Sequence, residues 1–250
     1  MMPRVVFVTV GLSAVDNKEI AEKSDALREQ MGEDDARVLF NRLEDRPEQV
    51  DAIEALFLES HRDFWNERDG YRETREHFRQ TSAEMISTYM AIVSGSLGSG
   101  SFLQPGRDKV VLLLSDTVPG RVCGNINRVL FREFLFRPKS PQEQDIVLET
   151  IKGLDASGED PERFYIYPQV TEIIDRHAKD SESEVLFNIG GGYKGTIPAI
   201  THIAWTRYAD RAKILYMHDS SKATVTLTPE QGGTAMRENR ILFRRTGGYV

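Results

Sequence analysis

Hydrophobic and polar residues are distributed along the chain in a way that predicts buried strands. Short apolar runs rich in valine, leucine and isoleucine, with little polar alternation, are typical of strands covered on both faces of a sheet. Four such runs span residues 4–10, 110–114, 184–187 and 212–217. A shorter run at 224–227 is expected to pair beside the last of them as a hairpin.

Between these runs, apolar residues recur three or four positions apart and predict amphipathic helices. The helices are expected over residues 18–31, within the charged segment 33–79, and over 71–93, 122–136, a stretch ending near 178, and 197–205. Segment 146–151 fits either a strand or a helix. Strands that alternate with helices indicate an α/β fold, with a mostly parallel sheet and helices on both faces.

The charged segment 33–79 contains an apolar stripe at helical spacing, and Pro47 suits the first turn of its helix. The stripe consists of Val50, Ile53, Leu56, Phe57, Phe64 and Trp65. We expect the stripe to pack into the core and the charges to face solvent. Together with the next helix, this segment forms a helical insert over about 33–93. The serine- and glycine-rich segment 94–101 predicts a mobile loop, with a lid as the alternative.

The composition of the chain argues against several classes of function. A net charge of −7 and a pI near 5.4 argue against binding duplex DNA or an anionic membrane through overall charge. The apolar runs are far shorter than the roughly 20 residues that span a bilayer, and no signal peptide is expected. Cys123 is the only cysteine, so we expect no intrachain disulfide and a cytoplasmic protein. The histidines lack metal-binding spacing, so neither a metal nor another cofactor is expected.

The glycine-rich loop at residues 190–195 joins a predicted strand to a predicted helix and contains Lys194. Backbone N–H groups, the positive end of a helix dipole and a lysine together favour a phosphate-bearing ligand. The alternative is a tight turn with a solvated lysine. Ser13, which follows the first strand, is either a simple turn or cap residue or a hydroxyl that faces the ligand.

Ligands of open α/β sheets bind beyond the carboxyl ends of the strands, so the polar turns after the strands are expected to share one edge. Three weak signals then point to one anion or nucleotide site. Its candidate residues are Gly11, Leu12, Ser13, Ser115, Asp116, Thr117, Gly190, Gly191, Gly192, Tyr193, Lys194, Gly195 and Thr196.

Sequence blocks 8–13, 113–117 (with Gly120 and Cys123) and 188–195 occur in an order that resembles a known family. A further block at 214–220, reaching Leu227, Thr228 and Pro229, is similar to that family's end. Together they resemble the CRISPR-associated Rossmann fold (CARF) domains of type III CRISPR systems, most closely the group that includes ring nucleases. The resemblance covers roughly residues 4–229, and its most specific element is Gly191-Gly192-Tyr193-Lys194-Gly195.

The resemblance implies one Rossmann-like CARF domain over residues 1–229, which contains the insert, followed by a short extension at 230–250. It implies a homodimer whose two copies form one pocket for a cyclic oligoadenylate, most often the four- or six-membered ring, and cyclic tetra-adenylate is expected here. Ring nucleases cut this messenger without metal: a ribose 2′-hydroxyl attacks the adjacent phosphate and leaves linear products with 2′,3′-cyclic phosphate ends. This reaction switches off type III CRISPR signalling.

The resemblance assigns catalytic roles to Lys194 and Ser13. Lys194 would stabilise charge on the phosphoryl oxygens, helped by N–H groups of the loop, and Ser13 would hydrogen-bond the phosphate or ribose. No histidine lies in the three turns, so a strong general base is missing and turnover is expected to be slow. Asp116 is expected to have a structural role or to contact a ribose.

The sequence is compatible with three functions. The first is a ring nuclease, and the second is a sensor that binds the same ligand without cutting it and activates a partner or effector. Only about 20 residues follow Pro229, which is too few for an independent output domain and favours the enzyme. The third is an unrelated nucleotide-binding α/β protein. A transcription regulator is disfavoured, because no basic recognition helix stands out.

Overall fold

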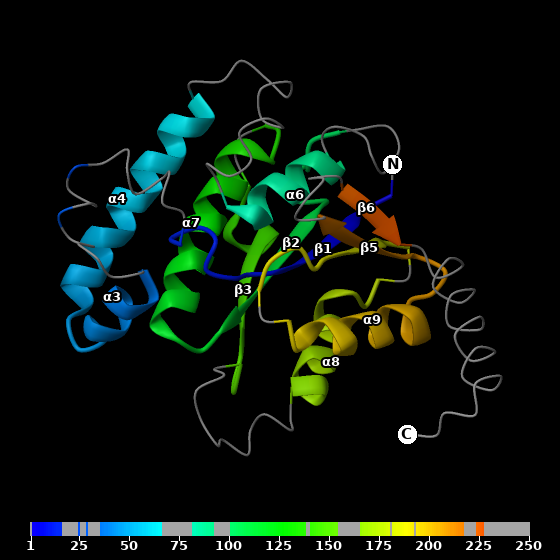
Figure 1. The fold of residues 1–250 in the computed structure, drawn as a ribbon. Helices are drawn as coiled ribbons and strands as arrows, with labels where there is room; N and C mark the ends of the chain where they lie inside the picture. The colour runs from blue at the N-terminus through cyan, green and yellow to red at the C-terminus, as the bar shows by residue number, and fades with distance from the viewer. Residues whose placement is uncertain are drawn as a thin grey trace.

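The computed structural model of the 250-residue chain describes residues 2–16, 25, 29, 36–66, 82–92, 101–138, 141–154, 166–180, 182–192, 194–217 and 224–227. Within these parts of the chain, six strands form one sheet (Figure 1). The strands are β1 Arg4–Thr9, β2 Lys109–Ser115, β3 Ile146–Ile151, β4 Glu184–Asn188, β5 Ala212–Met217 and β6 Thr224–Leu227.

The strand order is β3-β2-β1-β4-β5-β6. The first five strands run parallel, and β6 pairs antiparallel with β5. The α/β class, the mostly parallel sheet and the final hairpin are therefore confirmed. Segment 146–151, which the sequence left open, is a strand because it pairs with β2 along its whole length.

Helices cover both faces of the sheet (Figure 1). They are α3 Ala36–Arg42, α4 Pro47–Asn66, α6 Ala83–Ile92, α7 Val118–Phe134, α8 Ile166–His177 and α9 Thr196–Arg207, with a short 3-10 helix η2 at Glu143–Asp145. Alternate residues of β1 face opposite layers. Val6 and Val8 belong to the core beneath α3, α4, α6 and α7, whereas Val5 and Phe7 belong to the core beneath α8 and α9. This two-sided burial explains the continuous apolar strands.

Helix α7 begins at Val118, four residues before its predicted start. In the structure Thr117 caps the helix, its side chain accepting a hydrogen bond from the backbone N–H of Gly120, and the proline lies in the first turn. Proline is tolerated there because the N–H that it lacks has no helical partner at that position.

Helices α4 and α6 lie within the predicted insert, but the helix expected over 71–93 does not run unbroken through Ser82. Ser82 accepts the backbone N–H of Met85 at 2.9 Å, and α6 begins at Ala83. Pro47 is the first residue of α4, and Ile53 and Phe57 are buried. Trp65 packs between Tyr89 of α6, at a tilted angle, and Phe134 of α7, on which it stacks, with ring centroids 5.3 and 5.5 Å away. This contact, worth about 1 kcal/mol per aromatic pair beyond the buried area, fixes α4 against the other two helices.

Several predicted features lie outside the described residues. They are the helix at 18–31 apart from positions 25 and 29, the break at Gly70, the loop at 94–100, Tyr193, and the extension at 230–250.

Asp108 anchors the start of β1 at the amino edge of the sheet. Its carboxylate accepts hydrogen bonds from Arg4 Nη2 at 2.6 Å, Arg107 Nη2 at 2.7 Å and the backbone N–H of Gln104 at 2.9 Å. Burial alone would raise the pKa of Asp108. The hydrogen bonds from Arg107, Arg4 and Gln104 and the charge of Arg4 outweigh burial, so the pKa lies below its ordinary value.

Candidate functional site

The loops that follow β1 and β4 meet at the carboxyl edge of the sheet. Strand β1 lies between β2 and β4, and the chain continues from β1 and from β4 into opposite halves of the sheet. Ligands of open α/β sheets bind at this kind of switch point. The two loops touch through their backbones: a Cβ placed on Gly11 would lie 2.6 Å from the backbone nitrogen of Gly192. The structure thus brings the first and third predicted turns together.

The glycine-rich loop needs glycine for conformation as well as for close approach. Gly192 has a φ of 79°, in the left-handed region that side chains disfavour. A Cβ on Gly192 would also lie only 2.8 Å from Cβ of Thr9. The Thr9 hydroxyl donates to the carbonyl oxygen of Gly191 at 2.5 Å. The last residue of β1 therefore fixes the path of the loop after β4.

Glu84 is the residue at this edge that the sequence analysis missed. It lies in the first turn of α6 and is 0% exposed. Its carboxylate accepts hydrogen bonds from the backbone N–H of Gly11 at 2.7 Å and from the Ser13 hydroxyl. Gly191 lies so close that a Cβ there would overlap the Glu84 carboxylate. Glutamate is rarely buried, and its partners come 73 and 71 positions earlier, so no local pattern indicated it.

Asn188 ties the same helix to the glycine-rich loop. It is the last residue of β4 and is fully buried. Its amide nitrogen donates to the hydroxyls of Ser87 and Thr88, each at 2.7 Å, and its carbonyl oxygen accepts from the backbone N–H of Gly190 at 3.0 Å. Both loops of the candidate site are thus bonded to α6.

The turn after β2 is bonded within itself. The hydroxyls of Ser115 and Thr117 lie 2.8 Å apart, and Thr117 caps α7. The side chain of Asp116 is exposed, and its backbone oxygen accepts a hydrogen bond from Arg121 Nη1 at 3.2 Å. Among the described residues, hydrogen bonds join this turn to α7 rather than to the other two turns. Ser115 and Thr117 therefore have a structural role here.

Lys194 and Gly195 are exposed at the start of α9. Gly195 is the N-cap residue, and no side chain caps the helix there. The first turn therefore presents the positive end of the helix dipole next to the Lys194 side chain. Thr196 begins the helix and is buried.

Leu12 contributes to the turn after β1. It packs against the core beneath α7, and its carbonyl oxygen accepts hydrogen bonds from the backbone N–H groups of Val15 at 2.9 Å and Asp16 at 2.7 Å. These contacts give Leu12 a structural role. Its predicted ligand contact stays a prediction, as do those of the other candidate residues.

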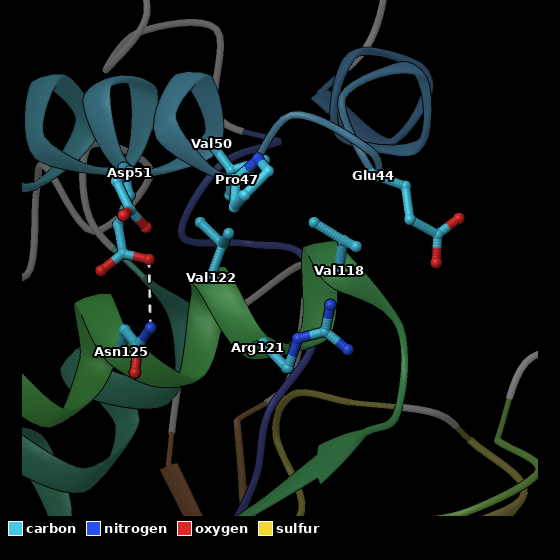
Figure 2. Close-up of a pocket in the computed structure, with 9 residues that line it drawn as sticks. Glu44, Pro47, Val50, Asp51, Val118, Arg121, Val122 and Asn125 are labelled. Atoms are coloured by element: carbon cyan, nitrogen blue, oxygen red, sulfur yellow. Dashed lines mark hydrogen bonds between the residues drawn. The ribbon is translucent and has the colours of Figure 1, made fainter.

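A separate cavity of about 190 Å³ lies between α4 and α7 (Figure 2). Val122 of α7 points toward Val50 and Pro47 of α4 (Figure 2). Glu54 also lines the cavity and accepts a hydrogen bond from the Asn125 amide at 3.1 Å. Burial, with the charge of Asp51, raises the pKa of Glu54 above its ordinary value. None of the predicted site residues lines this cavity.

The described parts of the chain contain neither a cluster of metal ligands nor a membrane-spanning helix. No three His, Cys, Asp or Glu side chains in these parts gather closely enough to hold a metal ion. No helix in these parts combines the length and apolar character of a bilayer span.

Residues 79–230 match the model of a protein family described as CRISPR-associated protein (Cas_APE2256). This match spans more than half of the 250 residues. The chain belongs to this CRISPR-associated family. The match runs from just before α6 through β6, so it includes Glu84, Asn188 and the glycine-rich loop. It leaves out β1 and helices α3 and α4. No curated protein matches the chain.

Proposed function

We propose that this CRISPR-associated protein binds a cyclic oligoadenylate, cyclic tetra-adenylate in the first instance, and cleaves it without metal. The products are linear oligoadenylates with 2′,3′-cyclic phosphate ends, and the reaction switches off type III CRISPR signalling. The observation that carries the proposal is the contact between the β1 and β4 loops, next to Lys194. The chain also belongs to a CRISPR-associated family.

The backbone of the glycine-rich loop supports binding of a phosphodiester. Glycine at positions 190–192 lets the loop pack closely on Asn188, Glu84 and Thr9, which holds the loop at this edge of the sheet. The loop leads directly into α9, whose first turn has no side-chain cap. An anion at that position gains roughly 0.3–1 kcal/mol from the helix dipole in addition to hydrogen bonds.

Lys194 supplies the cation that this reaction needs. Attack by the 2′-oxygen places extra negative charge on the phosphoryl oxygens, and an ammonium group held beside them lowers the barrier. In the described structure no carboxylate forms an ion pair with Lys194, which is exposed at this edge. Its charge is therefore available to a ligand.

A ring with two-fold symmetry is matched best by a protein dimer with two-fold symmetry. We propose that two copies of the chain face each other through the carboxyl edges of their sheets, so that each contributes one glycine-rich loop and one Lys194 to the pocket. Symmetric homodimers are the commonest oligomers, and the same residues then contact equivalent phosphates on opposite sides of the ring.

A second candidate function is a sensor that binds the ring without cutting it. The contacts of Ser13 also fit this alternative. Its hydroxyl donates to Glu84 and accepts from the backbone N–H of Ala83 at 2.9 Å. These bonds fix Ser13 as a link between the β1 loop and α6, whether or not it also contacts a ligand.

Incubation with cyclic tri-, tetra- and hexa-adenylate in the presence of EDTA tests both functions. We expect tight binding of one ring and its slow conversion to linear products with 2′,3′-cyclic phosphate ends, resolved by chromatography. Tight binding of a ring that stays intact for hours would support the sensor. If no ring binds, both functions are wrong. Light scattering with and without the ring measures the dimer.

Variants of Lys194 and Ser13 test the assigned roles. Lys194→Ala should weaken binding and cleavage, whereas Ser13→Ala should mainly slow cleavage. Lys179→Ala is the matched control, because Lys179 is also exposed but follows α8 at the opposite edge of the sheet. Unchanged cleavage by Lys194→Ala would remove Lys194 from its proposed role.

A further inference from the structure

Glu84 has the geometry of a proton acceptor linked to the site through Ser13. Its Oε2 accepts the hydrogen bond of the Ser13 hydroxyl, and its Oε1 accepts the backbone N–H of Gly11 at 2.7 Å. The residue is fully buried, so solvent does not compete for these bonds. Ser13 itself is half-buried in the loop after β1, where the proposed ligand would lie.

The hydrogen bonds of Ser13 leave one lone pair of its hydroxyl oxygen for a ligand. A serine hydroxyl has one hydrogen and two lone pairs. The hydrogen is directed to Glu84, and one lone pair accepts the backbone N–H of Ala83 at 2.9 Å. Toward a ligand, Ser13 therefore presents the remaining lone pair and acts as an acceptor. A ribose 2′-hydroxyl is a donor that fits this acceptor, whereas a phosphate oxygen is not.

We infer that Ser13 accepts the proton of the attacking 2′-hydroxyl while Glu84 accepts the proton of Ser13. This inference rests on the proposed cleavage of a cyclic oligoadenylate. The 2′-oxygen then forms a bond to phosphorus, and the bond from phosphorus to the 5′-oxygen breaks. The 5′-oxygen leaves with a proton from solvent, and Glu84 later returns its proton to Ser13, which passes one to solvent. The pair supplies the general base that no histidine provides.

Both oxygens of Glu84 act as acceptors, one for the N–H of Gly11 and one for the Ser13 hydroxyl. A glutamine of the same shape has one acceptor oxygen, so it could keep the bond to Gly11 but could not take the proton of Ser13. Glutamine at position 84 therefore preserves the anchor to the β1 loop and removes the proton acceptor.

Neighbouring groups define the pH dependence of this pair. Gly11 and Ser13 face Glu84 from the β1 loop, and Cys123 approaches it from α7. Burial, with the charges of Glu84 and Glu54, raises the pKa of the Cys123 thiol well above its ordinary value. Cys123 therefore stays neutral through the working pH range and does not shape the pH–rate profile.

The test compares the wild-type protein with Glu84→Gln and the control Glu172→Gln, whose glutamate is exposed on α8. Binding of cyclic tetra-adenylate, the melting temperature and single-turnover cleavage are measured from pH 5 to 9. General-base catalysis contributes about 10²–10⁴-fold, so Glu84→Gln should lose cleavage by that factor and keep its affinity within about threefold. The control should match the wild type.

The pH profile separates proton transfer from support of the fold. The wild-type rate should rise less steeply with pH than the Glu84→Gln rate. The Glu84→Gln rate should keep rising with pH, because hydroxide must then remove the 2′ proton. If Glu84→Gln cleaves like the wild type, or slows without a change of profile, the relay is refuted and the proposed function stands. If the wild type cuts no ring, the proposed function fails and the relay fails with it.

Discussion

Replacement of Gly192 by alanine tests the contact between the β1 and β4 strand ends most directly. The substitution has two separate effects. It places a side chain at a φ of 79°, and it puts a Cβ 2.8 Å from Cβ of Thr9 and 3.1 Å from its carbonyl carbon. Gly106 offers a matched control, because it has a φ of 71° but nothing within 4 Å of an added Cβ.

The magnitudes follow from these two terms. The left-handed backbone costs an alanine about 1–2 kcal/mol at either position. Alanine also restricts the unfolded chain, which offsets about 0.4–1 kcal/mol. Gly106→Ala should therefore lower the free energy of unfolding by roughly 1 kcal/mol. Gly192→Ala adds about 1–3 kcal/mol of overpacking against Thr9, for a total loss of roughly 2–4 kcal/mol.

Urea unfolding followed by the fluorescence of Trp65 and Trp205 measures both losses. The m-value should not change, since neither variant alters the surface exposed on unfolding. Gly192→Ala should also weaken binding of a cyclic oligoadenylate, whereas Gly106→Ala should not. Equal losses of stability in the two variants would refute the close approach of Gly192 to Thr9.

Three further predictions concern the rest of the fold. Asp108→Ala should lower the free energy of unfolding by about 3–5 kcal/mol because it leaves buried Arg4 without its carboxylate, whereas the exposed control Glu172→Ala should cost about 0–1 kcal/mol. The pKa of Asp108 is lowered in the folded state, so its contribution to the free energy of unfolding is present above about pH 4 and is lost as the pH falls through the folded-state pKa. Acid unfolding of the wild type and of Asp108→Ala measures this loss. Cys123 is buried with a raised thiol pKa, so a chromogenic thiol reagent should react with it only after unfolding. Burial and the hydrogen bond to a neighbouring carboxylate raise the pKa of Tyr208 to about 12, so one tyrosine in an ultraviolet pH titration should ionise only near that value.

Local patterns predicted the sheet because its strands are covered on both faces. Val6 and Val8 face one layer of helices, and Val5 and Phe7 face the other. Because both faces of the strand are buried, its residues form a continuous apolar run that is visible in the sequence. The start of α7 could not be predicted in the same way. Pro119 suits a turn and the first turn of a helix equally, and the capping bond of Thr117 decides between them.

Part of the candidate site could be predicted because it is marked by local sequence features. Strand ends and glycines are local features, so the Gly11 and Gly192 loops could be assigned to one edge. The buried role of Glu84 depends on partners more than 70 positions away. In the sequence it is one more charged residue inside the helix predicted over 71–93, where a glutamate ordinarily faces solvent.

The packing of Gly191 on Glu84 also restricts how related sequences can vary. A side chain at position 191 would occupy the space of the Glu84 carboxylate, so the two positions share one volume. Both lie within the segment that matches the family model. Among relatives, any residue larger than glycine at 191 should therefore occur together with a residue shorter than glutamate at 84, and the two positions should change as a pair.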